Sequence, residues 1–156
     1  MNSQIRRATA EDAAAISQVI IRSLRQSNAQ DYLPEVIAQV EKSFTPEAVF
    51  ALLSQRQVFV ATLDHRVVAT ASLEGDVVRS VFVDPSHQAG GLGRQLMATI
   101  ESVAIDAKIA VLRVPSSLTA EGFYSKLGFR KVRDEFHGAE RTIVMERHLS
   151  MLADRG

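Results

Sequence analysis

The sequence predicts a mixed α/β (α+β) fold, a sheet with helices on its faces, in a single domain spanning residues 1–156. Three observations predict it. Apolar residues at helical spacing dominate the first third of the chain, and segments rich in β-branched residues dominate the middle. Strands and helices then alternate toward the C-terminus. The 156 residues, 46% of them hydrophobic, suit one domain with its own core, and no repeat or linker-like stretch divides them.

The first third of the chain reads as one short strand followed by three helices. Residues 4–8 form the strand, and "TAED" (9–12) has the capping-box form that starts a helix. Behind it, apolar residues recur at helical spacing, at Ile16, Val19, Ile20 and Leu24. A second helix is predicted for 34–42. A third follows "TPE", where Thr45 can cap the helix and Pro46 suits its first turn.

The middle of the chain predicts an antiparallel meander and then a helix. Three β-branched segments, 57–64, 66–75 and 76–85, are separated by turn residues, as in a three-strand meander. A helix is predicted from about 91 to 106. Its inward stripe is Leu92, Leu96, Ile100 and Val103.

The last third predicts a buried strand, a short helix and a hairpin. Residues 109–114 are apolar except for Arg113, as in a buried strand. Residues 119–128 form a short helix that ends in glycine, which suits a left-handed cap. The strands 129–136 and 141–149 flank His137-Gly138, a hairpin turn. The predicted order is therefore β-α-α-α-β-β-β-α-β-α-β-β.

The composition excludes several classes of function. Eighteen basic residues balance eighteen acidic ones, so no overall field attracts nucleic acid or an anionic membrane, and neither partner is expected. The absence of cysteine excludes disulfides, thiolate nucleophiles and cysteine zinc sites, and fits a reducing cytoplasm. The N-terminus lacks the apolar stretch of a signal peptide, and no run approaches the roughly 18 apolar residues of a membrane span. We therefore expect a cytoplasmic protein.

The segment "HQAGGLGRQL" (87–96) places three glycines within four positions, between a strand and a helix. Glycine lets backbone amides approach a ligand with no Cβ in the way. The first turn of the helix adds unpaired N–H groups and the positive end of the helix dipole. This order predicts a site for phosphate or pyrophosphate, although a glycine-rich turn that merely joins strand to helix has the same spacing.

Two familiar phosphate-binding motifs are excluded. A dinucleotide fingerprint counted from Gly91 needs glycine at position 96, where the chain has Leu96. A P-loop needs Gly-Lys followed by Ser or Thr, and the chain contains no Gly-Lys pair.

Gln88-x-x-Gly91-x-Gly93 after a strand resembles the pyrophosphate loop of the GNAT superfamily of acyl-CoA-dependent N-acyltransferases. "VFVDPSHQAGGLGRQLM" is similar to that family's fourth strand, loop and third helix, and "SLTAEGFYSKLGF" to its second signature. "QIRRATAEDAAAI" resembles its first strand and helix. The resemblance covers nearly the whole chain and is weakest between about residues 26 and 57.

The resemblance implies a mixed, mostly antiparallel sheet of about six to seven strands, with helices on both faces and a splay between strands four and five. It also implies acetyl-CoA as co-substrate and no metal. The family's cofactor-binding backbone corresponds here to Val81, Phe82 and Val83 for the pantetheine arm, and to Gln88, Ala89, Gly90, Gly91, Leu92, Gly93 and Arg94 for the pyrophosphate. Val81 and Val83 also suit the core, and Arg94 also suits an ordinary solvated side chain.

Ser117 stands where many members of the family carry Asn. A serine hydroxyl can still hydrogen-bond the cofactor, but its reach is shorter. The resemblance therefore implies that Ser117 contacts the cofactor, through a side chain shorter than the asparagine of many members.

Tyr124 stands where the family often places the acid that protonates the leaving thiolate. A tyrosine has a pKa near ~10 and a cysteine-like thiol near ~8.5, so the mismatch is small. The alternative for Tyr124 is core packing with its hydroxyl at the edge. The donor to the developing oxyanion is expected to be a backbone N–H of the fourth strand near Phe82.

The general base is not apparent from the sequence. Val77 stands where some members of the family carry a glutamate, so that base is absent. Glu74 and Asp76, in the turn just before it, are candidates that act directly or through water, although turn carboxylates are usually only solvated. Histidines 65, 87, 137 and 148 lack metal-ligand spacing and are expected at the surface. Arg130, Lys131 and Arg133 are either a solvated strand edge or contacts for the cofactor's 3′-phosphate.

The function implied is transfer of an acetyl group from acetyl-CoA to a primary amine of a small molecule or peptide. The alternatives are an acetyltransferase acting on a protein N-terminus or lysine, a catalytically inactive acyl-CoA-binding regulatory module, and a nucleotide-binding protein of another class. Asp31 and Tyr32 either line the acceptor pocket or belong to a plain turn between helices. A homodimer is possible, since dimers are common among members of the family.

Overall fold

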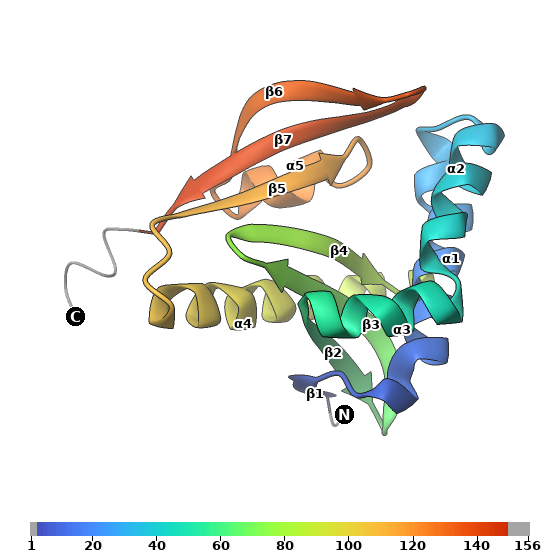
Figure 1. Cartoon of the computed structure of the whole chain (residues 1–156), viewed down its shortest axis with the longest axis horizontal. Helices are drawn as coiled ribbons and strands as arrows, with labels where there is room; N and C mark the ends of the chain where they lie inside the picture. The colour runs from blue at the N-terminus through green and yellow to red at the C-terminus, as the bar shows by residue number, and fades with distance from the viewer. Residues whose placement is uncertain (1–2, 150–156) are drawn as a thin grey trace.

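The computed structural model describes residues 3–149 and consists of strands and helices in the predicted order (Figure 1). The strands are β1 (Ser3–Arg7), β2 (Gln57–Leu63), β3 (Arg66–Glu74), β4 (Val77–Val83), β5 (Val111–Ser117), β6 (Arg130–His137) and β7 (Glu140–His148). The α-helices are α1 (Ala13–Gln26), α2 (Pro34–Glu41), α3 (Pro46–Gln55), α4 (Leu92–Asp106) and α5 (Glu121–Lys126). Short 3-10 turns join several of them, including η4 (Pro85–Gly90).

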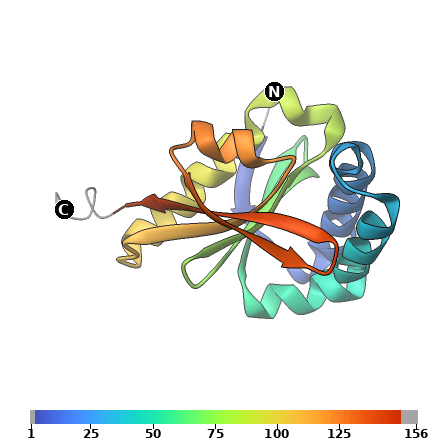
Figure 2. The ribbon, with the colours of Figure 1, turned by 90° about the horizontal axis from the view of Figure 1, so that it is seen from above.

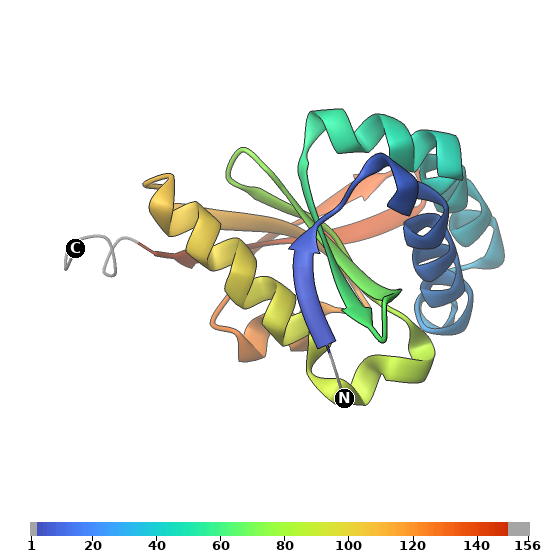
Figure 3. The same ribbon diagram turned by 90° about the horizontal axis from the view of Figure 1, so that it is seen from below.

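The seven strands form one sheet in the order β1-β2-β3-β4-β5-β7-β6. All neighbouring strands are antiparallel except β4 and β5, which are parallel. Helices α1, α2 and α3 cover one face of the sheet, and α4 and α5 cover the other (Figures 2 and 3). The predicted mixed, mostly antiparallel sheet with helices on both faces is therefore confirmed.

Strands β4 and β5 touch at one end only. Val77 and Arg113 form their single registered pair among the described residues, and the Arg113 N–H donates to the Asp76 carbonyl at 3.0 Å. From there the strands diverge, so that β5, β7 and β6 lie apart from the first four strands (Figure 1). The predicted splay between strands four and five is confirmed.

Each face of the sheet has its own apolar core. On the α4 side, Leu96, Met97 and Ile100 are fully buried against the sheet. The predicted stripe is confirmed at Leu92, Leu96 and Ile100, whereas Val103 is only partly buried and Ala104 takes the next inward place. A spacing of four from Leu92 leads to Ala104, which presents no large apolar side chain to mark it. On the other face, Ile16, Ile20 and Leu24 of α1 are buried as predicted.

Local sequence signals set most element ends. The Thr45 hydroxyl accepts the Ala48 N–H at 3.2 Å, and Pro46 is the first residue of α3. The Asp12 carboxylate accepts the Thr9 N–H at 2.7 Å but closes a 3-10 turn, so α1 begins only at Ala13. Gly128 after α5 and Gly138 in the β6–β7 turn have φ of +96° and +63°, the left-handed values that glycine permits. No helix within residues 3–149 has the length and apolar character needed to cross a bilayer.

Shortening Leu96 to alanine should lower the free energy of unfolding by about 2–5 kcal/mol, because its side chain is fully buried and its loss leaves a cavity. Urea denaturation followed by circular dichroism measures the change. Gln95→Ala, at the exposed neighbouring position on the same helix, should stay within about 0.5 kcal/mol of the wild type. A loss below about 1 kcal/mol for Leu96→Ala would contradict this packing of α4.

Candidate active site

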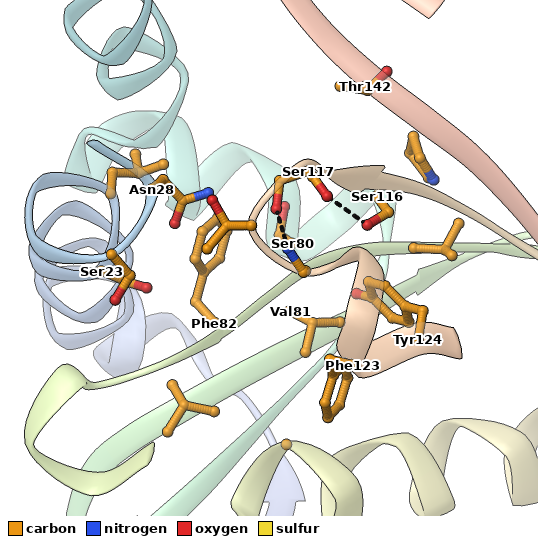
Figure 4. A pocket seen from close by; sticks show the side chains of 18 of the residues that line it. Ser23, Asn28, Ser80, Val81, Phe82, Ser116, Ser117, Phe123, Tyr124 and Thr142 are labelled. Carbon is orange, nitrogen blue, oxygen red and sulfur yellow. Dashed lines mark hydrogen bonds between the residues drawn. The ribbon is translucent and has the colours of Figure 1, made fainter. Parts of the chain in front are cut away.

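A cavity of about 960 Å³ lies where β4 and β5 part. Its walls come from α1, α2, β4, the start of α4, β5, α5 and the β6–β7 hairpin. Figure 4 shows side chains from both halves of the sheet converging on it. The volume lies at the upper end of the range for small-molecule and cofactor sites.

The β4 wall contains a β-bulge. Phe82 pairs with Thr70 and Arg79 with Ser72, so β4 carries one residue more than β3 between these pairs. Ser80, within the bulge, has φ of +54°, a left-handed value that costs a non-glycine residue about 1 kcal/mol or more. Bulges re-aim side chains and interrupt pairing beside functional sites, and this one faces the cavity.

The backbone of β4 points polar groups into the gap beside β5. The Asp84 N–H donates to the Val68 carbonyl of β3 at 2.8 Å. Because the amides of successive residues alternate in direction along a regular strand, that of Val83 turns away from β3, toward the side that β5 leaves open. The side chains of Val81 and Val83 pack toward α4, whereas Phe82 packs on the opposite face, edge-to-face with Phe44 at 6.0 Å.

The glycine segment forms the first turn of a helix at the end of β4. Residues 85–90 are a 3-10 turn, and Gly91, with φ of +76°, precedes α4 without a side-chain cap. The first-turn N–H groups, from Leu92 to Arg94, therefore have no partner in the helix. Together with the helix dipole, they form a place for an anion beside the cavity.

The three glycines of this segment lie in different structural settings. Gly91 has the left-handed backbone that other residues rarely adopt. A Cβ on Gly93 would lie 3.2 Å from the Phe123 ring, so this glycine permits the contact between α4 and α5. Gly90 is exposed and a Cβ there would meet nothing within 4 Å.

Most of the predicted cofactor residues line the cavity: Val81, Phe82, Val83, Gln88, Gly91, Gly93, Arg94 and Ser117. Ala89 and Gly90 lie in η4, and Leu92 is buried in the core. The Gln88 amide donates to the Ser27 hydroxyl at 3.2 Å, which ties η4 to the end of α1. Arg94 is exposed at the cavity wall.

Ser117 closes the end of β5. Its hydroxyl oxygen accepts the Ala120 N–H at 3.1 Å, and the Ser116 hydroxyl donates to the Ser117 carbonyl at 2.7 Å (Figure 4). A hydroxyl that accepts one hydrogen bond keeps its own proton to donate. The position therefore both holds the entry to α5 and offers a donor to the cavity.

Tyr124 packs in the core and also lines the cavity. Its side chain is only 3% exposed and packs edge-to-face on Phe123 and Phe129, at centroid distances of 5.1 and 5.5 Å. Its hydroxyl points into the cavity (Figure 4). Burial raises the pKa of Tyr124 well above its usual value, so the hydroxyl keeps its proton throughout the physiological range.

Neither carboxylate considered as a base, Glu74 or Asp76, lines the cavity. Glu74 lies instead between Arg56 and Arg79, with its Oε1 3.7 and 3.3 Å from their Nε atoms. Among the described residues, Glu140 is the one carboxylate of the cavity wall. Sequence reasoning missed Glu140, since only the pairing of β7 with β5 brings the start of β7 to the cavity.

The remaining titratable candidates lie mostly elsewhere. His137 lines the cavity beside Glu140, whereas the other three histidines do not. Lys131 and Arg133 form ion pairs along the exposed strand β6, with Asp134 at 3.2 Å and Glu135 at 2.7 Å. Within residues 3–149, no three His, Asp or Glu side chains form a group able to hold a metal ion.

Tyr32 links the two halves of the molecule at the cavity. Its hydroxyl accepts the Leu118 N–H at 2.8 Å and donates to the Arg141 carbonyl at 2.7 Å. The neighbouring Asp31 carboxylate accepts the Thr119 hydroxyl at 2.7 Å. The segment between α1 and α2 is therefore more than a plain turn. It is hydrogen-bonded to the residues just after β5 and to β7, and it places Tyr32 in the cavity wall.

The comparisons with known proteins agree with this geometry. A model of the acetyltransferase (GNAT) domain matches residues 28–146. The N-acetyltransferase YafP of Escherichia coli (strain K12) is 27% identical over 137 residues, which cover 86% of this chain and 85% of YafP.

Two solved structures share the fold over nearly their whole length. A GCN5-related N-acetyltransferase from Rhodopseudomonas palustris has a TM-score of 0.90 at 25% identity, with 96% of this chain and 97% of that chain covered. PaiA N-acetyltransferase from Thermoplasma acidophilum, solved in complex with coenzyme A, has a TM-score of 0.81 at 17% identity, with 96% and 100% covered. The matched domain, the splayed sheet and the cavity lead to one conclusion: the chain belongs to the GNAT acetyltransferase family.

Proposed function

We propose that the protein transfers an acetyl group from acetyl-CoA to a primary amine of a small molecule or peptide. The observation that carries the proposal is the continuity of the cavity: it runs from the first turn of α4, along the open side of β4, to the hydroxyl of Tyr124. The coenzyme A bound to the structurally similar PaiA supports the choice of cofactor.

In this proposal the cofactor binds through backbone groups. The pyrophosphate accepts N–H groups from the segment Gln88–Arg94, and the pantetheine arm lies along β4 as an added strand, bonded to the N–H of Val83 and to the carbonyl of Val81. Ser117 donates to it from the other side of the gap. The side chains of Arg94 and Lys126 line this part of the cavity and offset the charge of the phosphates.

The chemistry assigns one group to each charge that develops. The neutral amine attacks the thioester carbonyl, and a C–N bond forms as the C–S bond breaks. The Val81 N–H, at the bulge beside Phe82, stabilises the oxyanion. Tyr124 donates its proton to the departing thiolate. The proton lost by the amine passes to Glu140, directly or through water.

The raised pKa of Tyr124 is compatible with this role. Apolar surroundings raise the pKa of a thiol as they raise that of a phenol, so the buried pair stays closer in pKa than the tyrosine shift alone suggests. The hydroxyl in the cavity also favours an enzyme over a module that only binds acyl-CoA. A thiol-release assay with acetyl-CoA across amines, amino acids and peptides tests this choice, and binding of CoA without turnover on any acceptor would favour the binding module.

Replacing Gly91 by glutamate should weaken CoA binding at least tenfold, because the new carboxylate lies beside the proposed pyrophosphate site. The left-handed backbone at Gly91 also strains any side chain, so some stability is lost with it. Calorimetric titration with CoA measures the affinity.

Gly75→Glu is the matched control for this variant. Gly75 has a similar φ of +62° and equally open surroundings, but it lies in the turn at the other end of β4. The substitution Gly75→Glu introduces the same backbone strain and the same charge, and the variant should bind CoA as the wild type does. Equal affinity for Gly91→Glu and Gly75→Glu would exclude the glycine segment as the pyrophosphate site.

Tyr124→Phe removes one hydroxyl and keeps the ring. If the hydroxyl protonates the thiolate, kcat should fall about 10²-fold while the affinity for acetyl-CoA changes much less, because the proton is needed only in the transition state. With thioesters whose thiols are more acidic, the fall in kcat should be smaller. Since the pKa is raised, wild-type kcat should not decline from ionisation of this group up to about pH 9.

Steady-state thiol release gives kcat, and a pre-steady-state burst shows whether chemistry limits it. With chemistry limiting, a Tyr124→Phe enzyme within about twofold of the wild type would remove Tyr124 from the mechanism and leave water as the proton source.

A further inference from the structure

The cavity extends beyond the cofactor path, past the bulge of β4, toward the helices of the opposite face. Apolar side chains line this region: Leu24, Val36, Ile37, Val40, Phe44 and Phe82. The cations Arg56 and Arg79 line it too, with Ser80. Phe44, Arg56 and Ser80 also share a small hollow of about 10 Å³, which places the apolar wall next to the arginine.

Arg56 is held in place with spare donors. It follows α3, its side chain is only 15% exposed, and its Nη1 donates to the Ser80 hydroxyl at 3.1 Å. The Nε atoms of Arg56 and Arg79 are buried, and neither forms a hydrogen bond within the described part of the chain. A guanidinium has five N–H donors in a fixed fork, so one bond to Ser80 leaves most of those of Arg56 unused.

Within the described residues, the charge of these two arginines is only partly balanced. Their shared neighbour Glu74 contributes one carboxylate to two cations, is 43% exposed, and lies outside the cavity wall. Two effects lower the pKa of Arg56, burial as the main cause and the charge of Arg79, whereas the charge of Glu74 raises it. A ligand anion at this place would offset both effects and accept the unused N–H groups.

The phosphates of the cofactor are not that anion. Arg79 precedes Val83 by four residues of β4, a span of roughly 13 Å at the rise of an extended strand, and the anion-binding turn follows Val83. A pyrophosphate at the start of α4 is therefore well separated from Arg79 along the cavity wall. An anion bound at this place would therefore belong to the acceptor.

We propose that the acceptor is an amine that carries a carboxylate on the same molecule, as an apolar amino acid does, with Arg56 and Arg79 binding the carboxylate. The apolar wall receives the hydrocarbon side chain. This inference rests on the proposed acetyl transfer and narrows its acceptor. Two guanidinium groups suit a carboxylate, whose two oxygens accept paired N–H bonds.

The test compares acceptors that carry a carboxylate with analogues that lack it. Leucine, methionine and phenylalanine are assayed against their primary amides and their decarboxylated amines, with thiol release from acetyl-CoA as the readout. We expect kcat/KM for the acids to exceed that for the amides at least tenfold, the effect of one charge-assisted hydrogen bond. The less basic amine of the amides works against this preference, so the comparison is stringent.

The arginine variants assign the preference to its residues. Arg56→Gln and Arg79→Gln should each reduce the acid-to-amide ratio to within about threefold, mainly by raising KM for the acids, while rates with the amides hold. Arg66→Gln, at an exposed arginine that starts β3, should keep the wild-type ratio. Thermal melting checks the fold of each variant, and either arginine variant alone suffices if the other does not fold.

The outcomes distinguish the inference of a carboxylate-bearing acceptor from the proposed acetyl transfer on which it rests. Thiol release with amines or amides at rates equal to or above those of the acids would overturn the inference and leave acetyl transfer standing. Equal losses with acids and amides in the variants would show a structural role for the arginines, and a preference for aminoalkyl phosphates or for polar amino acids would also contradict it. No thiol release with any acceptor would contradict acetyl transfer itself, and this inference with it.

Discussion

The parting of β4 from β5 is the constraint on which the rest of the structure depends. A strand inside a sheet normally satisfies its N–H and C=O groups on both sides, and unpaired groups away from water are costly. Here the two central strands share one registered pair, at Val77 and Arg113, and then diverge. The open side of β4 is therefore a row of donors and acceptors available to an extended ligand, which is how a sheet edge recognises a peptide-like chain.

The separation is maintained from both ends. Where β4 begins, the backbone hydrogen bond between Arg113 and Asp76 holds the two strands together. At the cavity, the Tyr32 hydroxyl is bonded to Leu118 and Arg141 and holds the first helices against the C-terminal strands. α4 begins at the far end of β4, so its unpaired first-turn amides lie beside the gap. The cavity thus stays open without a partner strand, and the bulge at Ser80 lies in its wall.

Local signals in the sequence were sufficient for the elements and for the residues that line the cavity near the start of α4. Thr45 and Pro46 start a helix through contacts within four residues. The run of glycines indicates a left-handed residue and a helix that follows it. The acceptor side was not predictable in this way. Glu140 and Arg56 reach the cavity only through the packing of a hairpin and of α3, and turn position alone made Glu74 look a better base than it is. Long-range contacts of this kind leave no periodic signal in the chain.

Amide NMR of the uniformly ¹⁵N-labelled protein, titrated with CoA, tests most directly the claim that the open edge of β4 and the first turn of α4 bind the cofactor through their backbone. We predict large shift changes and slowed hydrogen exchange at Val81 and Val83 of β4 and at Leu92 and Gly93 of α4, with Ile5 of β1 unchanged as an internal reference. Saturable CoA binding that leaves these four amides unperturbed, or that perturbs a different surface, would contradict it.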